Sequence, residues 1–167
     1  MGKIALVSLG GAGTAIMREI IRLSEKDYDM FNVNSRKVLE GPKFYGFEEI
    51  EVLADELKDY ECVVMTAGLG STGGDALVKL QSCLKDVRKV CFVVSPFYFE
   101  IDRLMRSRSQ ISQILTGSFE GAVVGLNSIL SGELEENADT RKALEEAIKK
   151  FDREMASMIL DMMMELE

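Results

Sequence analysis

The chain contains no histidine and no tryptophan, and it has only two prolines and three cysteines in 167 residues. Without histidine, a Ser-His-Asp triad, a Cys-His dyad and a Cys/His zinc site are all excluded. The cysteines, Cys62, Cys83 and Cys91, are odd in number and lack the spacing of metal ligands. Cys62 and Cys91 fall in apolar, strand-like runs, where a free thiol behaves as a small core residue.

An excess of basic residues is also missing. Acidic residues outnumber basic ones 28 to 20, which gives a net charge of -8. Such a protein repels the phosphate backbone, so we expect no nucleic-acid partner. The short arginine cluster, Arg103, Arg106 and Arg108, follows the acidic Glu100 and Asp102, and it indicates a solvated helix face.

No apolar run approaches the roughly 20 residues that span a bilayer, so we expect no membrane span. No charged-then-apolar leader precedes the first strand-like run. These two absences predict a cytoplasmic protein. The length and an apolar fraction of 47 % predict a single domain over residues 1–167.

Short apolar runs rich in Val, Ile or Phe alternate with longer helix-like segments. The expected strands are 3–9, 30–34, 61–66, 89–95 and 121–126, and the expected helices between them are 14–26, 46–58, 74–86 and 100–115. The strand runs are apolar throughout, which favours a parallel sheet covered on both faces. The alternation predicts a three-layer, mainly parallel, Rossmann-like α/β fold.

The segment 139–166 predicts one long helix, because it lacks glycine and proline and repeats apolar residues in steps of four and three. Those residues are at 144, 148, 151, 155, 158, 162 and 166. Ile159, Met163 and Met164 lie off this seam, so the last turns are expected to be apolar on more than one side. An uncovered apolar side is uncommon in a monomer, and we expect another chain to bury it.

Two glycine-rich segments each follow a strand and open a helix. The first contains Gly10, Gly11, Ala12, Gly13 and Thr14, and the second contains Gly68, Gly70, Ser71, Thr72, Gly73 and Gly74. In doubly wound sheets, ligands bind outside the carboxyl ends of the strands, where both segments fall. Glycine lets backbone N–H groups approach an anion, and a helix start adds unpaired donors. The pair predicts a site for nucleotide phosphates.

A dinucleotide site and a P-loop are alternative interpretations of these segments. A dinucleotide fingerprint requires Gly or Ala three residues after Gly13, where Ile16 stands, and an acidic residue near Asn34. No Gly-Lys-Ser/Thr follows either segment, so a P-loop is excluded. Simple capping of the following helix by Ser71 or Thr72 stays open as an alternative to phosphate binding.

With these segments in place, the chain resembles the nucleotide-binding half of the FtsZ/tubulin family. Residues 10–14 resemble its first phosphate loop, and 67–74 its glycine-threonine loop, shortened by one residue. Residues 31–35 match its strand-end asparagine segment, and 93–100 its Pro-Phe-x-Phe-Glu stretch. Asn127 stands where the family places an asparagine that contacts the nucleoside. Together the five matches cover about 130 residues in the family's order.

The resemblance implies a site for GTP or GDP, with both glycine segments on the phosphates and Mg²⁺ entering through those phosphates. It places Asn34, Glu100 and Asn127 around the nucleoside. Arg103 is taken as the counterpart of the family's arginine, although the family places that arginine one position later, where Leu104 stands here. A role in a filament, as in cell division or the cytoskeleton, would follow.

The departures from the family concern hydrolysis and base choice. Residues 39–43 are a poor substitute for the loop that senses the terminal phosphate, and neither Met155 nor Ile148 supplies the polar reader of guanine. The family's water-activating acidic loop and second domain, which follow the long helix, are not in this sequence. Hydrolysis would therefore require a partner subunit to supply that loop.

Three functions stay open on these grounds. The favoured one is guanine-nucleotide binding by a minimal domain that associates with itself or with an FtsZ/tubulin-like partner through the 139–166 helix. The alternatives are a GTPase completed by a partner's acidic loop, and a degenerate interaction module that has lost the nucleotide.

Overall fold

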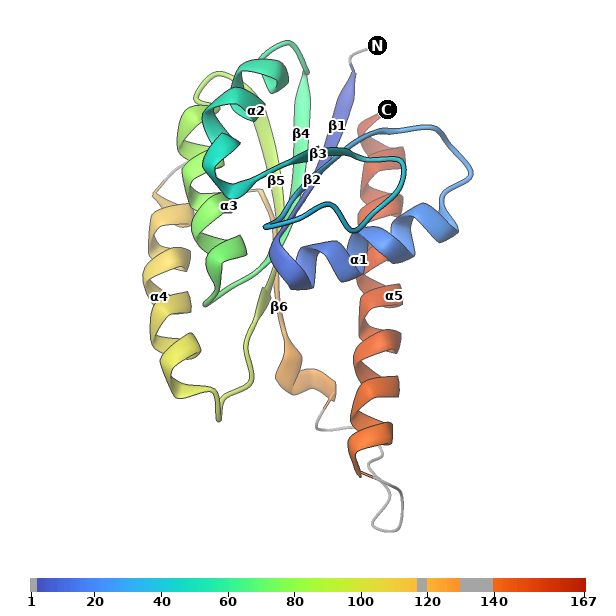
Figure 1. Cartoon of the computed structure of the whole chain (residues 1–167), viewed down its shortest axis with the longest axis vertical. Helices are drawn as coiled ribbons and strands as arrows, with labels where there is room; N and C mark the ends of the chain where they lie inside the picture. The colour runs from blue at the N-terminus through green and yellow to red at the C-terminus, as the bar shows by residue number, and fades with distance from the viewer. Residues whose placement is uncertain (1–2, 117–119, 130–139) are drawn as a thin grey trace.

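A six-stranded parallel sheet lies between two layers of helices in the computed structural model, which describes residues 3–116, 120–129 and 140–167 (Figure 1). The strand order is β3-β2-β1-β4-β5-β6, and every neighbouring pair is parallel. The strands are β1 (Ile4–Leu9), β2 (Asp29–Val33), β3 (Lys43–Tyr45), β4 (Cys62–Gly68), β5 (Arg88–Ser95) and β6 (Gly121–Gly125). The helices are α1 (Gly10–Leu23), α2 (Ile50–Leu57), α3 (Thr72–Cys83), α4 (Ile101–Leu115) and α5 (Thr140–Leu166), with 3₁₀ turns at Phe47–Glu49 and Leu126–Ile129. The three-layer α/β prediction is confirmed.

Successive residues of each strand enter two separate hydrophobic cores, because side chains alternate across a sheet. On one face, Val7 of β1 belongs to the core that α2, α3 and α4 complete, with Leu77 of α3 fully buried there. On the other face, Leu6 packs in the core completed by α1 and α5, with Ile159 of α5. Each such buried aliphatic side chain stabilises the fold by about 1.5–3 kcal/mol.

The expected elements are present, but several boundaries were wrong. The helix predicted at 14–26 begins at Gly10 and ends at Leu23, where the Ser24 N–H bonds the Ile20 carbonyl and the chain turns away. The helix predicted at 46–58 is split into a 3₁₀ turn and the shorter α2. A Glu49 carboxylate accepts the Gly46 N–H at 2.8 Å and fixes that turn.

Strand β3 was not predicted. It has three residues, and it pairs with β2 so that Phe31 lies opposite Lys43 and Val33 opposite Tyr45. A strand this short carries too few alternating residues to be distinguished from a turn. It extends the sheet by one strand beyond β2, on the side away from β5.

Helix α5 buries a different stripe from the one its spacing predicts. Phe151, Met155, Ile159 and Met163 are buried, whereas Met158 and Met162 are only partly buried. Ile159 and Met163, which lie off the predicted heptad seam, therefore belong to the buried stripe. The buried stripe repeats every four residues because α5 packs on α1 and the sheet, not on a coiled-coil partner. The predicted start at residue 139 lies outside the described residues.

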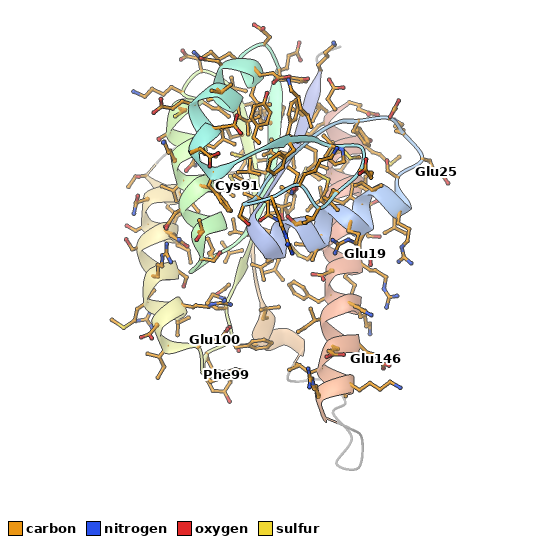
Figure 2. All side chains as sticks on the ribbon, viewed as in Figure 1. Glu19, Glu25, Cys91, Phe99, Glu100 and Glu146 are labelled. Atoms are coloured by element: carbon orange, nitrogen blue, oxygen red, sulfur yellow. The ribbon has the colours of Figure 1, made fainter. Side chains whose placement is uncertain are left out.

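The carboxyl group of Asp152, on α5, lies in an environment that disfavours its charged form. Burial, together with the nearby Glu19 of α1 (labelled in Figure 2), raises the pKa of Asp152 to about 6 from an ordinary value of 3.8. Between these two values the folded chain binds more protons than the unfolded chain. Its stability therefore falls as pH rises through this window, and the full penalty is present above about pH 6.

We expect Asp152→Asn to stabilise the protein at pH 8, because an amide carries no charge to bury. The gain in melting temperature should shrink as the pH falls toward about 4. Calorimetric scans of the parent and the variant across this range measure the difference. Glu146→Gln, an exposed carboxyl on the same helix, is the control and should show no such trend. A gain that grows toward acid pH would contradict the assignment.

Candidate functional site

The two glycine-rich segments come together at the carboxyl edge of the sheet. Strands β1 and β4 are neighbours with Leu9 opposite Ala67, so the helices that follow them start side by side (Figure 1). The two glycine-rich segments contact each other there through backbone atoms. A Cβ on Gly10 would lie 2.8 Å from the Gly73 Cα, and one on Gly73 would lie 2.6 Å from the Leu9 carbonyl oxygen. Gly10 also has a positive φ of 75°. Both positions require glycine.

The first glycine segment forms the first turn of α1 itself, whereas the sequence predicts a loop that precedes the helix. Neither Leu9, the N-cap of α1, nor Ser71, the N-cap of α3, makes a side-chain capping bond. The first amides of a helix have no intrahelical partner, and they carry the positive end of its dipole. Two such starts in contact form a local concentration of N–H donors suited to an anion.

The glycines of the first turn have different roles. A Cβ on Gly11 would meet nothing within 4 Å, and this residue is exposed. A Cβ on Gly13 would lie 2.6 Å from the Thr66 carbonyl oxygen, and one on Gly68 would lie 2.8 Å from the Ala12 Cβ. Gly13 and Gly68 therefore permit α1 to sit on β4. Gly11 is the position where a ligand could approach the backbone.

The second glycine segment is fastened by a residue that the sequence did not single out. Gln110 of α4 is buried, and its Oε1 accepts the Gly70 N–H at 2.6 Å. Its Nε2 donates to the Ser71 carbonyl at 3.2 Å and to Asp75 Oδ1 at 2.7 Å. The Gly70 amide is thus already engaged. No local pattern could have found Gln110, because it lies 40 residues from its main partner.

Arginines of α4 lie beside this segment. Gly70, Ser71 and Thr72 line a pocket of about 340 Å³ together with Asp102, Arg103 and Arg106 of α4. Arg103 pairs with Glu100 at 3.2 Å, and Arg106 pairs with Asp75. The Ser71 hydroxyl donates to the Gly68 carbonyl at 2.9 Å, while Thr72 is exposed. The structure therefore brings the predicted Arg103 to the predicted Ser71 and Thr72.

Thr14 is the centre of a buried hydrogen-bond cluster. Its hydroxyl donates to the Gly10 carbonyl at 2.6 Å and accepts from Asn32 Nδ2 at 2.9 Å and from Asn34 Nδ2 at 3.2 Å. The Asn34 Oδ1 also accepts the Ser35 N–H at 2.8 Å. This hydroxyl is occupied on both its donor and its acceptor sides. Thr14 therefore holds α1 against β2, and Asn34 lies at the end of β2 within the cluster.

A polar row crosses the sheet beneath α1. Ser8 lies opposite Asn32 on one side and Thr66 on the other, and all three are buried. Asn32 Nδ2 donates to the Ser8 hydroxyl at 2.8 Å. Within the described part of the chain, Asn32 Oδ1 and Thr66 Oγ1 have no hydrogen-bond partner. The row was not predicted, and its sequence signal is single polar residues at matching places in otherwise apolar strands.

Glu100 and Asn127 hold the loop between β5 and α4. Glu100 Oε2 accepts the Phe97 N–H at 2.9 Å, and Asn127 Oδ1 accepts the Tyr98 N–H at 3.0 Å. Phe99 and Glu100 lie at the lower end of the molecule in Figure 2, beyond the carboxyl ends of the strands. These two of the three predicted nucleoside contacts are therefore on the same edge as the glycine segments, and both already accept a hydrogen bond from a backbone N–H.

The matched pair Gly11→Ala and Gly13→Ala tests these packing assignments. Gly13→Ala should lower the free energy of unfolding by about 1–3 kcal/mol, because its methyl group meets a backbone oxygen. Gly11→Ala should change it by less than about 1 kcal/mol, since the methyl enters open space. Urea unfolding measures both. Equal losses would show that the two glycines are equivalent.

Gln110→Ala should weaken the protection of the backbone amides in the second glycine segment against hydrogen exchange. It leaves the Gly70 N–H without its acceptor and removes the bond to the Ser71 carbonyl, at a cost of about 1–3 kcal/mol. Hydrogen exchange of the Gly70 amide should become faster. Gln113→Ala, on the same helix with only a bond to Ser109, is the control and should leave that amide protected. Unchanged exchange in Gln110→Ala would contradict the assignment.

Comparisons with known proteins agree with this architecture. No family model matches the chain. It is 54 % identical over 166 residues to an uncharacterized protein of Archaeoglobus fulgidus, and the match covers 99 % of this chain and 96 % of that protein. The chain belongs to the family of this archaeal protein.

Among solved structures, the chain is similar to an empty FtsZ dimer from M. jannaschii, with a TM-score of 0.76 and 18 % identity. The match covers 95 % of this chain and 55 % of that FtsZ chain, so this chain spans about half the FtsZ length. The fold is therefore FtsZ-like, as the resemblance implied. No helix in residues 3–116, 120–129 and 140–167 is both long and apolar enough to cross a membrane.

Proposed function

We propose that this family binds a guanine nucleotide, GTP or GDP, at the carboxyl edge of the sheet. The observation that supports the proposal most is the contact between the uncapped starts of α1 and α3 at Gly10 and Gly73, in an FtsZ-like fold. Backbone amides at two helix starts offset phosphate charge without any basic side chain. This suits a chain with net charge -8.

In this proposal the phosphates approach the first turn of α1 at Gly11 and the first turn of α3 at Thr72, with Arg103 and Arg106 nearby. Asn34, Glu100 and Asn127 lie toward the nucleoside. Mg²⁺ would neutralise part of the phosphate charge when the nucleotide is bound. Residues 3–116, 120–129 and 140–167 contain no group of three or more acidic or cysteine side chains able to hold a metal. The ion would therefore depend on the phosphates and on hydroxyls such as Thr72.

The domain would then act by association with a second copy or with an FtsZ/tubulin-like partner through the 139–166 helix. A second candidate, an interaction domain that binds no nucleotide, is favoured by one observation. The Thr14 hydroxyl and the Gly70 amide, both expected on phosphate, already bond within the protein. Direct titration separates the two candidates.

Calorimetric titration with GTP, GDP, ATP and NAD in the presence of Mg²⁺ tests the proposal. We expect saturable binding of a guanine nucleotide, and Gly11→Val should abolish it while the fold is retained, because its side chain fills the open space at the α1 start. Ile21→Val, at the other end of α1, is the control and should bind as the parent does. Binding of none of the four ligands would contradict the proposal and support the interaction domain.

Gly70 is the wrong position for this test. It has a positive φ of 79°, and a Cβ there would overlap the Arg103 carbonyl oxygen. A substitution would disturb the loop whether or not a nucleotide binds. Gly11 avoids both problems.

A further inference from the structure

The outward side of α5 is a ridge between two apolar hollows. One hollow, of about 760 Å³, lies toward β6 and contains Met158 and Met162 together with Phe92 and Ala122. The other, of about 320 Å³, lies toward the end of α1 and contains Leu160 and Met164. Ser157 and Asp161 border both hollows, so they form the ridge.

Exposed charges follow this ridge in an ordered way. Lys149, Arg153, Ser157, Asp161 and Glu165 recur every four residues, and all five are exposed. Residues spaced by four form a continuous ridge on a helix surface. Two positive charges come first, a small residue stands at the centre, and two negative charges follow. Within the described part of the chain, none of the four charged members forms an ion pair.

The same polarity extends over the whole helix. Residues 140–153 include five basic and three acidic side chains, whereas residues 154–167 include four acidic and no basic ones. A partner surface with charges of one sign would attract one half of α5 and repel the other half. The surface that complements both halves is the same helix in the opposite direction.

We propose that this face binds a second copy of the chain, with the two α5 helices antiparallel and crossing at Ser157. In that register Arg153 faces the partner subunit's Asp161, and Lys149 faces the partner subunit's Glu165. Two-fold symmetry makes each pair twice. A parallel pairing would set like charges against each other, and a shift by one turn would break the pairs.

Exposed apolar side chains beside the ridge would become buried in this dimer and would add hydrophobic stabilisation to the ion pairs. Met164 is 59 % exposed and Leu23 is 42 % exposed, and both border the smaller hollow. Methionine adapts its shape to a partner surface, which suits hollows flanking a ridge. Ser157 is small enough to let two helices approach closely.

This interface goes beyond the proposed nucleotide binding and does not depend on it. Figure 1 shows the C-terminal half of α5 beside the amino ends of the strands, away from the edge where the glycine segments meet. Lys26, which follows α1, pairs with Glu167 at the helix end and keeps this half in place. Failure of the nucleotide titration would therefore leave the interface untouched.

Sedimentation equilibrium of the nucleotide-free protein at micromolar concentration tests the interface. The expected mass is twice the chain mass of 18.6 kDa. Arg153→Glu and Asp161→Arg should each raise the dissociation constant by roughly tenfold or more, because each turns two attractive contacts into repulsive ones. Arg108→Glu, a reversal on the exposed part of α4, is the control and should leave the dissociation constant unchanged.

An equimolar mixture of Arg153→Glu and Asp161→Arg chains is the decisive arm. In the mixed dimer, the glutamate introduced at position 153 of one chain faces the arginine introduced at position 161 of the other. The unchanged Asp161 of the first chain faces the unchanged Arg153 of the second.

 Both contacts therefore join opposite charges, and dimerisation should return to the parent level. A mass of 18.6 kDa throughout, single variants that dimerise as the parent does, or a mixture without recovery would overturn the proposal.

Cross-linking provides a second measurement that does not depend on charge. With Cys83 replaced by Ser, Ser157→Cys should form an intermolecular disulfide on mild oxidation, because the two copies of this residue meet at the symmetry axis. Ser112→Cys, exposed on α4, is the matched control and should stay monomeric on gels run without reductant. Equal cross-linking of the two variants, or none at Ser157→Cys, would overturn the antiparallel register.

Discussion

The candidate site depends on the backbone contact between Gly10 and Gly73. The neighbouring parallel strands β1 and β4 end side by side, and each is followed by a helix, α1 and α3. The starts of these two helices therefore lie in direct contact. Only residues without a Cβ allow this contact. The consequence is electrostatic as well as steric, because two sets of unpaired helix amides face the same edge. Gly13 and Gly68 then set how closely α1 lies on β4.

The polar groups behind this edge stabilise the geometry and also limit what remains for a ligand. Thr14, Asn32 and Asn34 bond to one another below α1, and Gln110 bonds to the second segment from α4. A buried polar atom without a partner costs about 1–3 kcal/mol, so these bonds hold both helix starts in place. The same bonds occupy donors that the resemblance to FtsZ would assign to phosphate. Nucleotide binding would therefore depend on the free amides of the first helical turns and on Gly11.

Helix α5 has a buried apolar face and an outward charged face. Its buried stripe packs against α1 and the sheet, and its outward ridge changes from basic to acidic along its length. The carboxyl edge of the sheet and the C-terminal half of α5 lie at opposite ends of the strands (Figure 1). The proposed ligand site and the proposed self-association surface are thus spatially separate in this fold. Asp152 lies near the middle of α5, close to Glu19 of α1.

Local pattern alone determined the fold class and the main element order. Uniformly apolar strand runs separated by amphipathic segments predicted the covered parallel sheet, since each run must bury both faces. The same local signals placed both glycine segments at helix starts. They failed for β3, which has three residues, and for the α5 stripe, where Ile159 and Met163 proved to be buried.

What only the tertiary structure decided is how residues distant in sequence meet. Gln110 reaches Gly70 across 40 residues, and Asn32 bonds Thr14 across 18, so neither pairing leaves a local trace. The difference between Gly11 and Gly13 is likewise invisible in the sequence, because it depends on whether β4 lies behind the Cα atom. Periodicity reports which face of an element is apolar, and the neighbour that covers that face is fixed by the folded sheet.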